Sequence, residues 1–144
     1  MRLTAFTDFG LRTLMYLTHL PENQLSSVPE VAKIYNASQN HFVKVIGQLT
    51  KLGYVQSIRG KNGGIRLAKK PEDINIGAVI RALENHLDAV DCEKTACRLN
   101  PGCELKQALS IAMDAFLSIM DNYTLRDIVK NKSQLIPLWQ AHEE

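Results

Sequence analysis

The stretch YVQSIRGKNGGIRLAKK, residues 54–70, decides the fold class of this chain of 144 residues. Two strand-like runs, YVQSI and GIRLA, flank a turn that contains Asn62 and Gly63. An Asn-Gly pair between two such runs is a strong local signal for a tight β-hairpin. The segment therefore predicts a small hairpin, with three cationic side chains on or beside its tip: Arg59, Lys61 and Arg66.

Three segments with helical periodicity precede this hairpin. The first is expected over about residues 7–20. The second begins at SVPE, where Ser27 can cap the helix and Glu30 can complete a capping box. The third begins after Ser38, a further cap, and ends near Gly53. Helix, tight turn, helix and hairpin together predict a winged helix-turn-helix, and hence a mainly α fold with a small β-hairpin.

The third predicted helix has one apolar and one polar face. Its apolar positions recur at helical spacing and are Phe42, Val45, Ile46, Leu49 and Leu52. The outward face carries Asn, Gln and Lys, which can bind base edges and phosphates, although an ordinary solvated face explains the helix alone equally well. The hairpin favours the first interpretation, so the predicted DNA contacts are Ser38, Gln39, Asn40, His41, Lys44, Arg59, Lys61, Asn62, Gly63 and Arg66.

The distribution of charge also indicates a polyanionic partner. The formal net charge is +2, but residues 1–70 carry ten Lys/Arg and three Asp/Glu, a balance of +7. Residues 71–144 carry seven Lys/Arg and twelve Asp/Glu, a balance of −5. The first half is therefore predicted to face double-stranded DNA, with a basic solvated surface as the plainer alternative.

The chain shows no membrane or secretion signal. No stretch approaches the ~18 apolar residues of a bilayer span. The first residues, MRLTAFTDFG, lack the basic start and apolar run of a secretory signal. We therefore expect a cytoplasmic protein with no membrane partner.

All three cysteines lie in CEKTACRLNPGC, residues 92–103, as Cys92, Cys97 and Cys103. In a reducing cytosol, closely spaced thiols bind metal or sense redox state more often than they form structural disulfides. Thiolates are the usual ligands of iron–sulfur clusters, whereas the commonest zinc spacing, two cysteines two residues apart, is absent. The spacing favours a cluster and leaves a zinc site and a bare thiol switch open.

The combined motifs resemble the winged-helix iron–sulfur transcription regulators of bacteria. The resemblance covers nearly the whole chain and rests on LTAFTDFGLR, SQNHFVKVI, IRGKNGGIRL and the cysteine spacing. It is greatest to the nitric-oxide-sensing NsrR type, because the IscR type has a wider first spacing and a histidine where this chain has Lys106. It implies an iron–sulfur cluster, 4Fe–4S or alternatively 2Fe–2S, held by Cys92, Cys97 and Cys103.

The resemblance further implies a fourth ligand from the partner subunit of a dimer. Asp8, in the matching FTDFG motif, is the residue at that position. An aspartate in the first turn of a helix is also stabilised by the helix dipole without any ligand role. An external water or small thiol is a further option, and the other candidate donors in the chain are His41, His86, Asp91, Glu93 and Glu104.

The second half is expected to provide the cluster loop and the dimerisation helices. We divide the chain into a winged domain, residues 1–75, and residues 76–144, which include the cluster loop at 86–103. Residues 104–123 predict one long helix with a heptad seam at Leu105, Leu109, Ala112, Phe116, Ile119 and Tyr123. A second apolar set comprises Ala108, Ile111, Met113, Ala115, Leu117 and Met120. It implies two packing surfaces, one for the winged domain and one for a second chain, with a helix fully buried in a monomer as the alternative.

These features predict a homodimeric repressor of palindromic operator DNA, whose cluster gates DNA affinity in response to nitric oxide. The alternatives are an iron- or redox-responsive regulator with an IscR-like role, and a zinc or thiol-switch protein on the same winged fold. We do not expect an enzyme, since no catalytic pair or nucleotide motif is present. The turn GKNGG precedes a strand rather than a helix and fits no P-loop.

Overall fold

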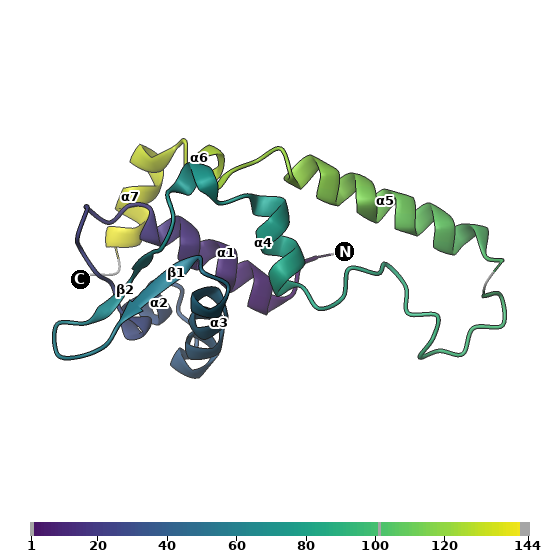
Figure 1. The fold of residues 1–144 in the computed structure, drawn as a ribbon, viewed down its shortest axis with the longest axis horizontal. Helices are drawn as coiled ribbons and strands as arrows, with labels where there is room; N and C mark the ends of the chain where they lie inside the picture. Colours follow the sequence, from purple (N-terminus) through teal and green to yellow (C-terminus); the bar gives the residue numbers. More distant parts are fainter. Residues whose placement is uncertain (1, 101, 142–144) are drawn as a thin grey trace.

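The computed structural model describes residues 2–100 and 102–141 and confirms the mainly α fold with one hairpin (Figure 1). Two antiparallel strands follow the third helix, and the long helix α5 follows an extended segment. The elements are α1 Ala5–Leu17, α2 Val28–Ile34, α3 Gln39–Lys51, β1 Val55–Ile58, β2 Gly64–Leu67, η1 Pro71–Asp73, α4 Ile76–Leu83, α5 Glu104–Met120, α6 Leu125–Ile128 and α7 Lys132–Gln140.

Helix α1 ends at Leu17, three residues before the predicted end. Two side chains satisfy its last carbonyl groups. The Thr18 hydroxyl donates to the Met15 carbonyl at 2.6 Å, and His19 Nδ1 lies 2.5 Å from the Tyr16 carbonyl oxygen. These two bonds satisfy carbonyl groups that backbone N–H groups would satisfy in a longer helix, so the helix can end at Leu17.

The two predicted helix caps differ in how their side chains are used. Ser27 caps α2 as predicted, since its hydroxyl accepts from the Glu30 backbone N–H at 3.3 Å. The Glu30 carboxylate does not complete a capping box; it accepts from Ser26 Oγ at 2.7 Å and from the Tyr16 hydroxyl at 2.8 Å. Ser38 is the N-cap of α3 but its side chain makes no capping bond. Glu30 therefore ties α2 to α1 instead of closing its own helix.

The core is centred on α3. Phe42, Val45 and Leu49 are fully buried, as the periodicity predicted. The Phe42 ring lies 4.9 Å from the Phe9 ring of α1 and 6.2 Å from the Tyr35 ring at the end of α2. Packing on both sides fixes α3 against the first two helices and leaves its opposite face outside.

The hairpin is present, but its turn is wider than predicted. The strands pair antiparallel, with Ile58 opposite Gly64, so residues 59–63 form a five-residue loop. The left-handed backbone conformation falls on Gly60, at φ 106°, and the Gly63 N–H donates to the Gly60 carbonyl at 3.0 Å. Gly63 thus closes a turn with Gly60 and does not form a two-residue turn with Asn62.

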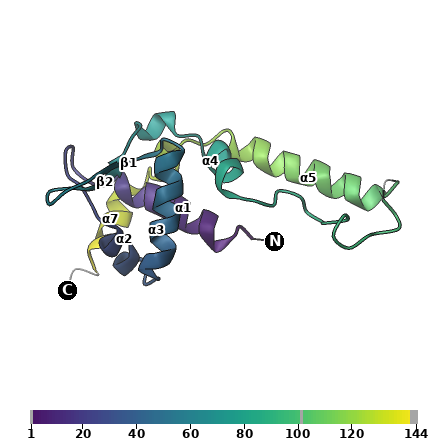
Figure 2. The same ribbon diagram turned by 60° about the horizontal axis from the view of Figure 1, so that its bottom comes forward.

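Helix α5 extends away from the winged part of the molecule, which comprises α1, α2, α3 and the hairpin of β1 and β2, in both views (Figures 1 and 2). It ends at Met120, three residues before the predicted end at Tyr123. Its body-facing side includes Met113, Phe116 and Met120, which pack against the core cluster. Phe116 was predicted on the same seam as Leu105 and Ile119, but it faces the body. The exposed apolar residues of α5 are instead Leu105 at 65%, Ile111 at 69% and Ile119 at 58% exposure.

The C-terminal residues return to the winged part. Thr124 and Asp127 form a capping box at the start of α6. Trp139 of α7, for which the sequence held no signal, is 7% exposed and donates from Nε1 to the Tyr35 hydroxyl at 3.2 Å. Lys132 Nζ donates to the Thr18 carbonyl at 2.6 Å. Helix α7 therefore supports the turn between α2 and α3. None of the helices within residues 2–100 and 102–141 is long and apolar enough to cross a bilayer.

Candidate nucleic-acid interface and cysteine loop

The outward face of α3 carries the predicted polar side chains. Gln39, Asn40 and Lys44 are exposed, while Phe42 on the opposite face is fully buried. Val43 lies among the polar residues and is 56% exposed. Apolar side chains in a major groove can contact the thymine methyl group. Val43 was missed because it was treated as neither core nor polar, although its spacing from Asn40 and Lys44 places it on that face.

His41 lies differently from the predicted outward position. Its ring is 5.1 Å from the Phe9 ring and 6.3 Å from the Phe6 ring, both of α1. Its Nε2 atom is buried and has no hydrogen-bond partner among the described residues. The side chain therefore packs between α1 and α3, because the first turn of α3 lies directly against the start of α1.

The hairpin presents the other predicted DNA contacts. Arg59, Lys61 and Asn62 are exposed in the loop, and Arg66 is half-buried, donating from Nε to Gln56 Oε1 at 3.0 Å. A Cβ at Gly63 would collide with the Ile58 carbonyl, which explains the glycine there. The loop thus holds two exposed cationic side chains, and the strand holds a third that is hydrogen-bonded to Gln56.

Helix α3 and the hairpin form one positively charged surface. They are joined by a short connection in which the Tyr54 N–H donates to the Leu49 carbonyl at 3.0 Å. Both lie away from α5 in Figures 1 and 2. Residues 31–71 contain eight Lys/Arg and no Asp/Glu. A surface with this charge and with exposed Asn, Gln and Lys on a helix is suited to binding nucleic acid.

The three cysteines lie on the segment between α4 and α5. Each is half-buried and carries a free thiol. The Cys97 N–H donates to the Cys92 carbonyl at 3.1 Å, which closes a short turn between the first two. Within that turn Asp91 accepts from the Lys94 backbone N–H at 3.0 Å, and this bond lowers the pKa of the Asp91 carboxyl. Cys103 is the N-cap residue of α5.

These thiols have the donor chemistry that an iron–sulfur cluster requires, since such clusters are held by cysteine thiolates. Among the described residues, however, no three metal-ligating side chains are gathered around one point. Cys92 lines a cavity of about 640 Å³ between the loop and α5, opposite Lys106 and Met113. Binding a cluster would therefore require this loop to draw its three cysteines together.

Asp8 lies in the first turn of α1 and is half-buried. Its Oδ1 accepts from Arg12 Nε at 2.8 Å. The Arg12 guanidinium lies 5.9 Å from the Tyr35 ring, and the Tyr35 hydroxyl donates to the Arg12 carbonyl at 2.8 Å. Burial raises the pKa of Tyr35 to about 12, so its hydroxyl remains a donor. Asp8 is thus connected through Arg12 to the turn before α3, and the cysteine segment extends toward the far end of α5 (Figure 1).

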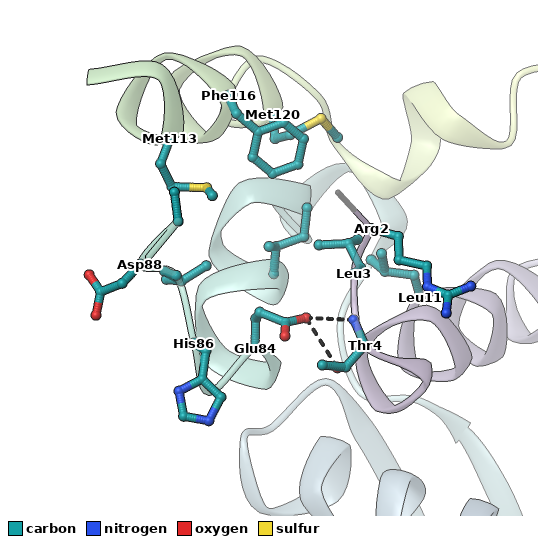
Figure 3. Close-up of a pocket in the computed structure, with 13 residues that line it drawn as sticks. Arg2, Leu3, Thr4, Leu11, Glu84, His86, Asp88, Met113, Phe116 and Met120 are labelled. Atoms are coloured by element: carbon teal, nitrogen blue, oxygen red, sulfur yellow. Dashed lines mark hydrogen bonds between the residues drawn. The ribbon is translucent and has the colours of Figure 1, made fainter. Parts of the chain in front are cut away.

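A cavity that the sequence did not indicate lies between the chain start, α4 and α5 (Figure 3). Its volume is about 520 Å³, and Met113, Phe116 and Met120 form the wall from α5. At its edge the Glu84 carboxylate accepts from the Thr4 backbone N–H and from the Thr4 hydroxyl, both at 3.1 Å. This contact fixes the start of α1 to the end of α4.

The profile of the Rrf2 family, described as iron-dependent transcriptional regulators, matches residues 3–131. The chain belongs to the Rrf2 family. Its members are DNA-binding transcription regulators, which confirms the predicted class of protein and the winged-helix fold.

Several solved structures of regulators are similar to this chain. CymR, the global cysteine regulator of B. subtilis, is 26% identical over 91% of this chain and 98% of its own, with a TM-score of 0.73. IscR of T. potens is 25% identical over 92% and 88%, with a TM-score of 0.71. The oxidised form of Staphylococcus aureus CymR is 26% identical over 89% and 95%, with a TM-score of 0.70.

Proposed function

We propose that this protein is a cytoplasmic, homodimeric repressor that binds palindromic operator DNA. The observation that carries the proposal is the exposed face of α3, joined to a hairpin in a region with eight Lys/Arg and no Asp/Glu. Helix α3 would enter the major groove and the hairpin would contact phosphates or the minor groove. The proposed contacts are Ser38, Gln39, Asn40, Val43 and Lys44 on α3, and Arg59, Lys61, Asn62, Gly63 and Arg66 on the hairpin.

The proposed dimer forms through α5. The exposed side of this helix carries Leu105, Ile111 and Ile119, each more than half exposed. Alanines at 108, 112 and 115 lie on the same side and are also exposed. Small residues between large apolar ones allow a second helix to approach closely. Two chains related by symmetry would read two half-sites about one helical turn apart or a multiple of it.

We propose that the segment 86–103 is the sensor. Cys92, Cys97 and Cys103 would hold an iron–sulfur cluster, most simply 4Fe–4S with 2Fe–2S as the alternative, and Asp8 of the partner subunit would be the fourth ligand. When bound, the cluster supplies iron that reacts with nitric oxide. Asp8 accepts from Arg12 Nε at 2.8 Å, so the residue that would hold the cluster of the partner also lies beside Arg12. Because Arg12 contacts Tyr35, a change at Asp8 would reach the turn before α3.

A second candidate is a zinc or thiol-switch regulator on the same winged fold, which would use the same loop. The favouring observation is that all three thiols are free, half-exposed and not gathered at one point. Oxidation of such thiols, or binding of zinc, would also change the loop without a cluster. CymR of S. aureus, a relative of similar length, has a structure in an oxidised form.

The DNA-binding proposal is tested by selecting binding sites from randomised double-stranded DNA. The expected product is an inverted repeat. Replacing Asn40 by Ala should relax base preference at one position in each half-site, because Asn pairs with adenine edges. The control Arg126→Ala, on α6, should leave the selected sequence unchanged. A selection without any enriched repeat would contradict the proposal.

The two sensor chemistries are separated by metal analysis of protein purified without oxygen. Stoichiometric iron and sulfide, with visible absorption that nitric oxide bleaches, would support the cluster. The Cys97→Ser variant should lose both the iron and the colour. Colourless wild-type protein with zinc or no metal, even after anaerobic reconstitution, would instead support the thiol or zinc switch.

A further inference from the structure

Helix α5 is attached to the rest of the chain mainly at its C-terminal end. Leu117, near that end, is its one buried residue among those described. The helix has 17 residues, which at about 1.5 Å per residue is roughly 25 Å in length. Most of that length extends beyond the winged part (Figures 1 and 2). The contacts at its C-terminal end therefore determine the direction in which the whole helix points.

A bidentate ion pair lies at this attachment. Arg81 of α4 donates from Nη1 to Asp121 Oδ1 at 2.5 Å and from Nη2 to Oδ2 at 2.8 Å. Asp121 is the C-cap residue of α5. Two parallel bonds between a planar guanidinium and a planar carboxylate fix orientation as well as distance. Arg81 thus constrains the angle at which α5 leaves α4.

Other contacts hold the same end of α5 against the first turn of α4. Asn75 Nδ2 donates to the Asp121 carbonyl at 2.7 Å, and the Ile76 N–H donates to the Tyr123 carbonyl at 2.9 Å. A Cβ at Gly77 would fall on the Asp121 carboxylate and would lie 2.9 Å from the Asp121 backbone nitrogen. Only glycine leaves room for the end of α5 at this position.

We infer that the Arg81–Asp121 pair positions α5 relative to the winged part, and thereby selects the half-site spacing of the operator. This inference rests on the proposed function, because it requires two chains joined through α5. If the two α5 helices are paired, each winged part turns about this junction. A rotation of about 10° over a radius of ~20 Å displaces the recognition helix by roughly 3.5 Å, close to the rise of one base pair.

The pair can be removed without endangering the fold. Both side chains are 41% exposed, and exposed ion pairs contribute little to folding stability. Loss of the pair should therefore act on geometry rather than on the amount of folded protein. A purely structural role would change stability and leave the preferred spacing as it was.

The test uses the selected operator with its half-site spacing lengthened or shortened by one base pair. Binding is measured by fluorescence anisotropy at one salt concentration. Wild-type protein should prefer one spacing. Arg81→Gln and Asp121→Asn should each reduce that preference by about fivefold, the upper range for one exposed ion pair. The control Arg126→Gln, which removes a 3.7 Å ion pair between α6 and Glu72 of η1, should leave the preference unchanged.

Two further variants test the same junction between α4 and α5. The charge exchange Arg81→Asp with Asp121→Arg should restore the wild-type preference. Gly77→Ala, which keeps both charges but displaces the end of α5, should shift the preference. An unchanged preference in Arg81→Gln, Asp121→Asn and Gly77→Ala, with the dimer intact by sedimentation, would overturn the inference. A wild-type protein that is monomeric or indifferent to spacing would instead overturn the proposed function on which the inference rests.

Discussion

Helices α3 and α5 are both amphipathic, yet they bury their apolar residues to very different extents. In α3 the residues Phe42, Val45 and Leu49 are fully buried within one chain. In α5 the residues Ile111 and Ile119 are 69% and 58% exposed. The core around α3 is thus complete within one chain, whereas α5 presents a surface that a second chain can cover. The two halves of the chain also differ in net charge, which is +7 for residues 1–70 and −5 for residues 71–144.

The largest effect is expected from breaking the core around α3. Phe42→Ala should lower the free energy of unfolding by about 3–5 kcal/mol, because the cavity would separate α3 from the Phe9 and Tyr35 rings. Val43→Ala, at the neighbouring exposed position, should change it by no more than about 0.5 kcal/mol. Urea unfolding followed by circular dichroism measures both. Equal losses would mean that α3 is not packed as described.

A charge on the exposed side of α5 should separate the two chains. Ile111→Asp places two carboxylates in the interface, one from each subunit, and should weaken dimerisation at least about 100-fold. Sedimentation equilibrium measures the dissociation constant. Gln24→Asp, on an exposed loop of the winged part, is the matched control and should remain dimeric. If Ile111→Asp dimerises normally, α5 pairs through another face.

Removing a wing cation should affect DNA binding and leave the dimer intact. Arg59→Ala or Lys61→Ala should each lower operator affinity about tenfold and reduce the slope of log affinity against log salt by about 0.9. Arg126→Ala removes a cation on α6, outside the proposed DNA contacts, and should change neither quantity. Titrations at three or more salt concentrations measure the slope. A normal slope in both wing variants would mean that the hairpin does not contact phosphates.

The smallest effect is expected from pH. The Thr124 backbone N–H, followed by its hydroxyl, lowers the pKa of Asp127 from 3.8 to about 2. Because the folded pKa lies below the unfolded one, Asp127 stabilises the fold above about pH 4, and this contribution is lost as pH falls toward 2. Asp127→Asn should flatten the dependence of stability on pH in that range. Thr124→Ala keeps the backbone donor and should remove only part of the dependence of stability on pH. An unchanged dependence in Asp127→Asn would show that the cap is absent.

Features encoded by neighbouring residues could be predicted from the sequence. The buried positions of α3 and the Ser27 cap follow from local spacing. The existence of the hairpin also follows, but its loop length does not, because the positive φ falls on Gly60 and the turn closes between Gly60 and Gly63. His41 was misplaced because its contacts are with α1, about thirty residues earlier.

Long-range contacts explain the remaining differences. Trp139 meets Tyr35 across 104 residues, so no local pattern could indicate that α7 supports the helix-turn-helix. Helix α5 is apolar on two sides, and only its packing on the body decides that Phe116 faces inward and Ile111 outward. The cysteine spacing places three thiols on one loop, but it does not determine how they are arranged there.

The most direct test is whether the cysteine loop controls the basic surface of α3 and the hairpin. Operator affinity is measured at one salt concentration for anaerobically prepared protein before and after nitric oxide, with Cys92→Ser in parallel. We predict at least about a 100-fold loss after nitric oxide, equivalent to ~2.7 kcal/mol. Cys92→Ser should bind weakly from the start and should not respond. Equal affinity before and after nitric oxide, in a wild-type protein shown to carry iron, would contradict the account.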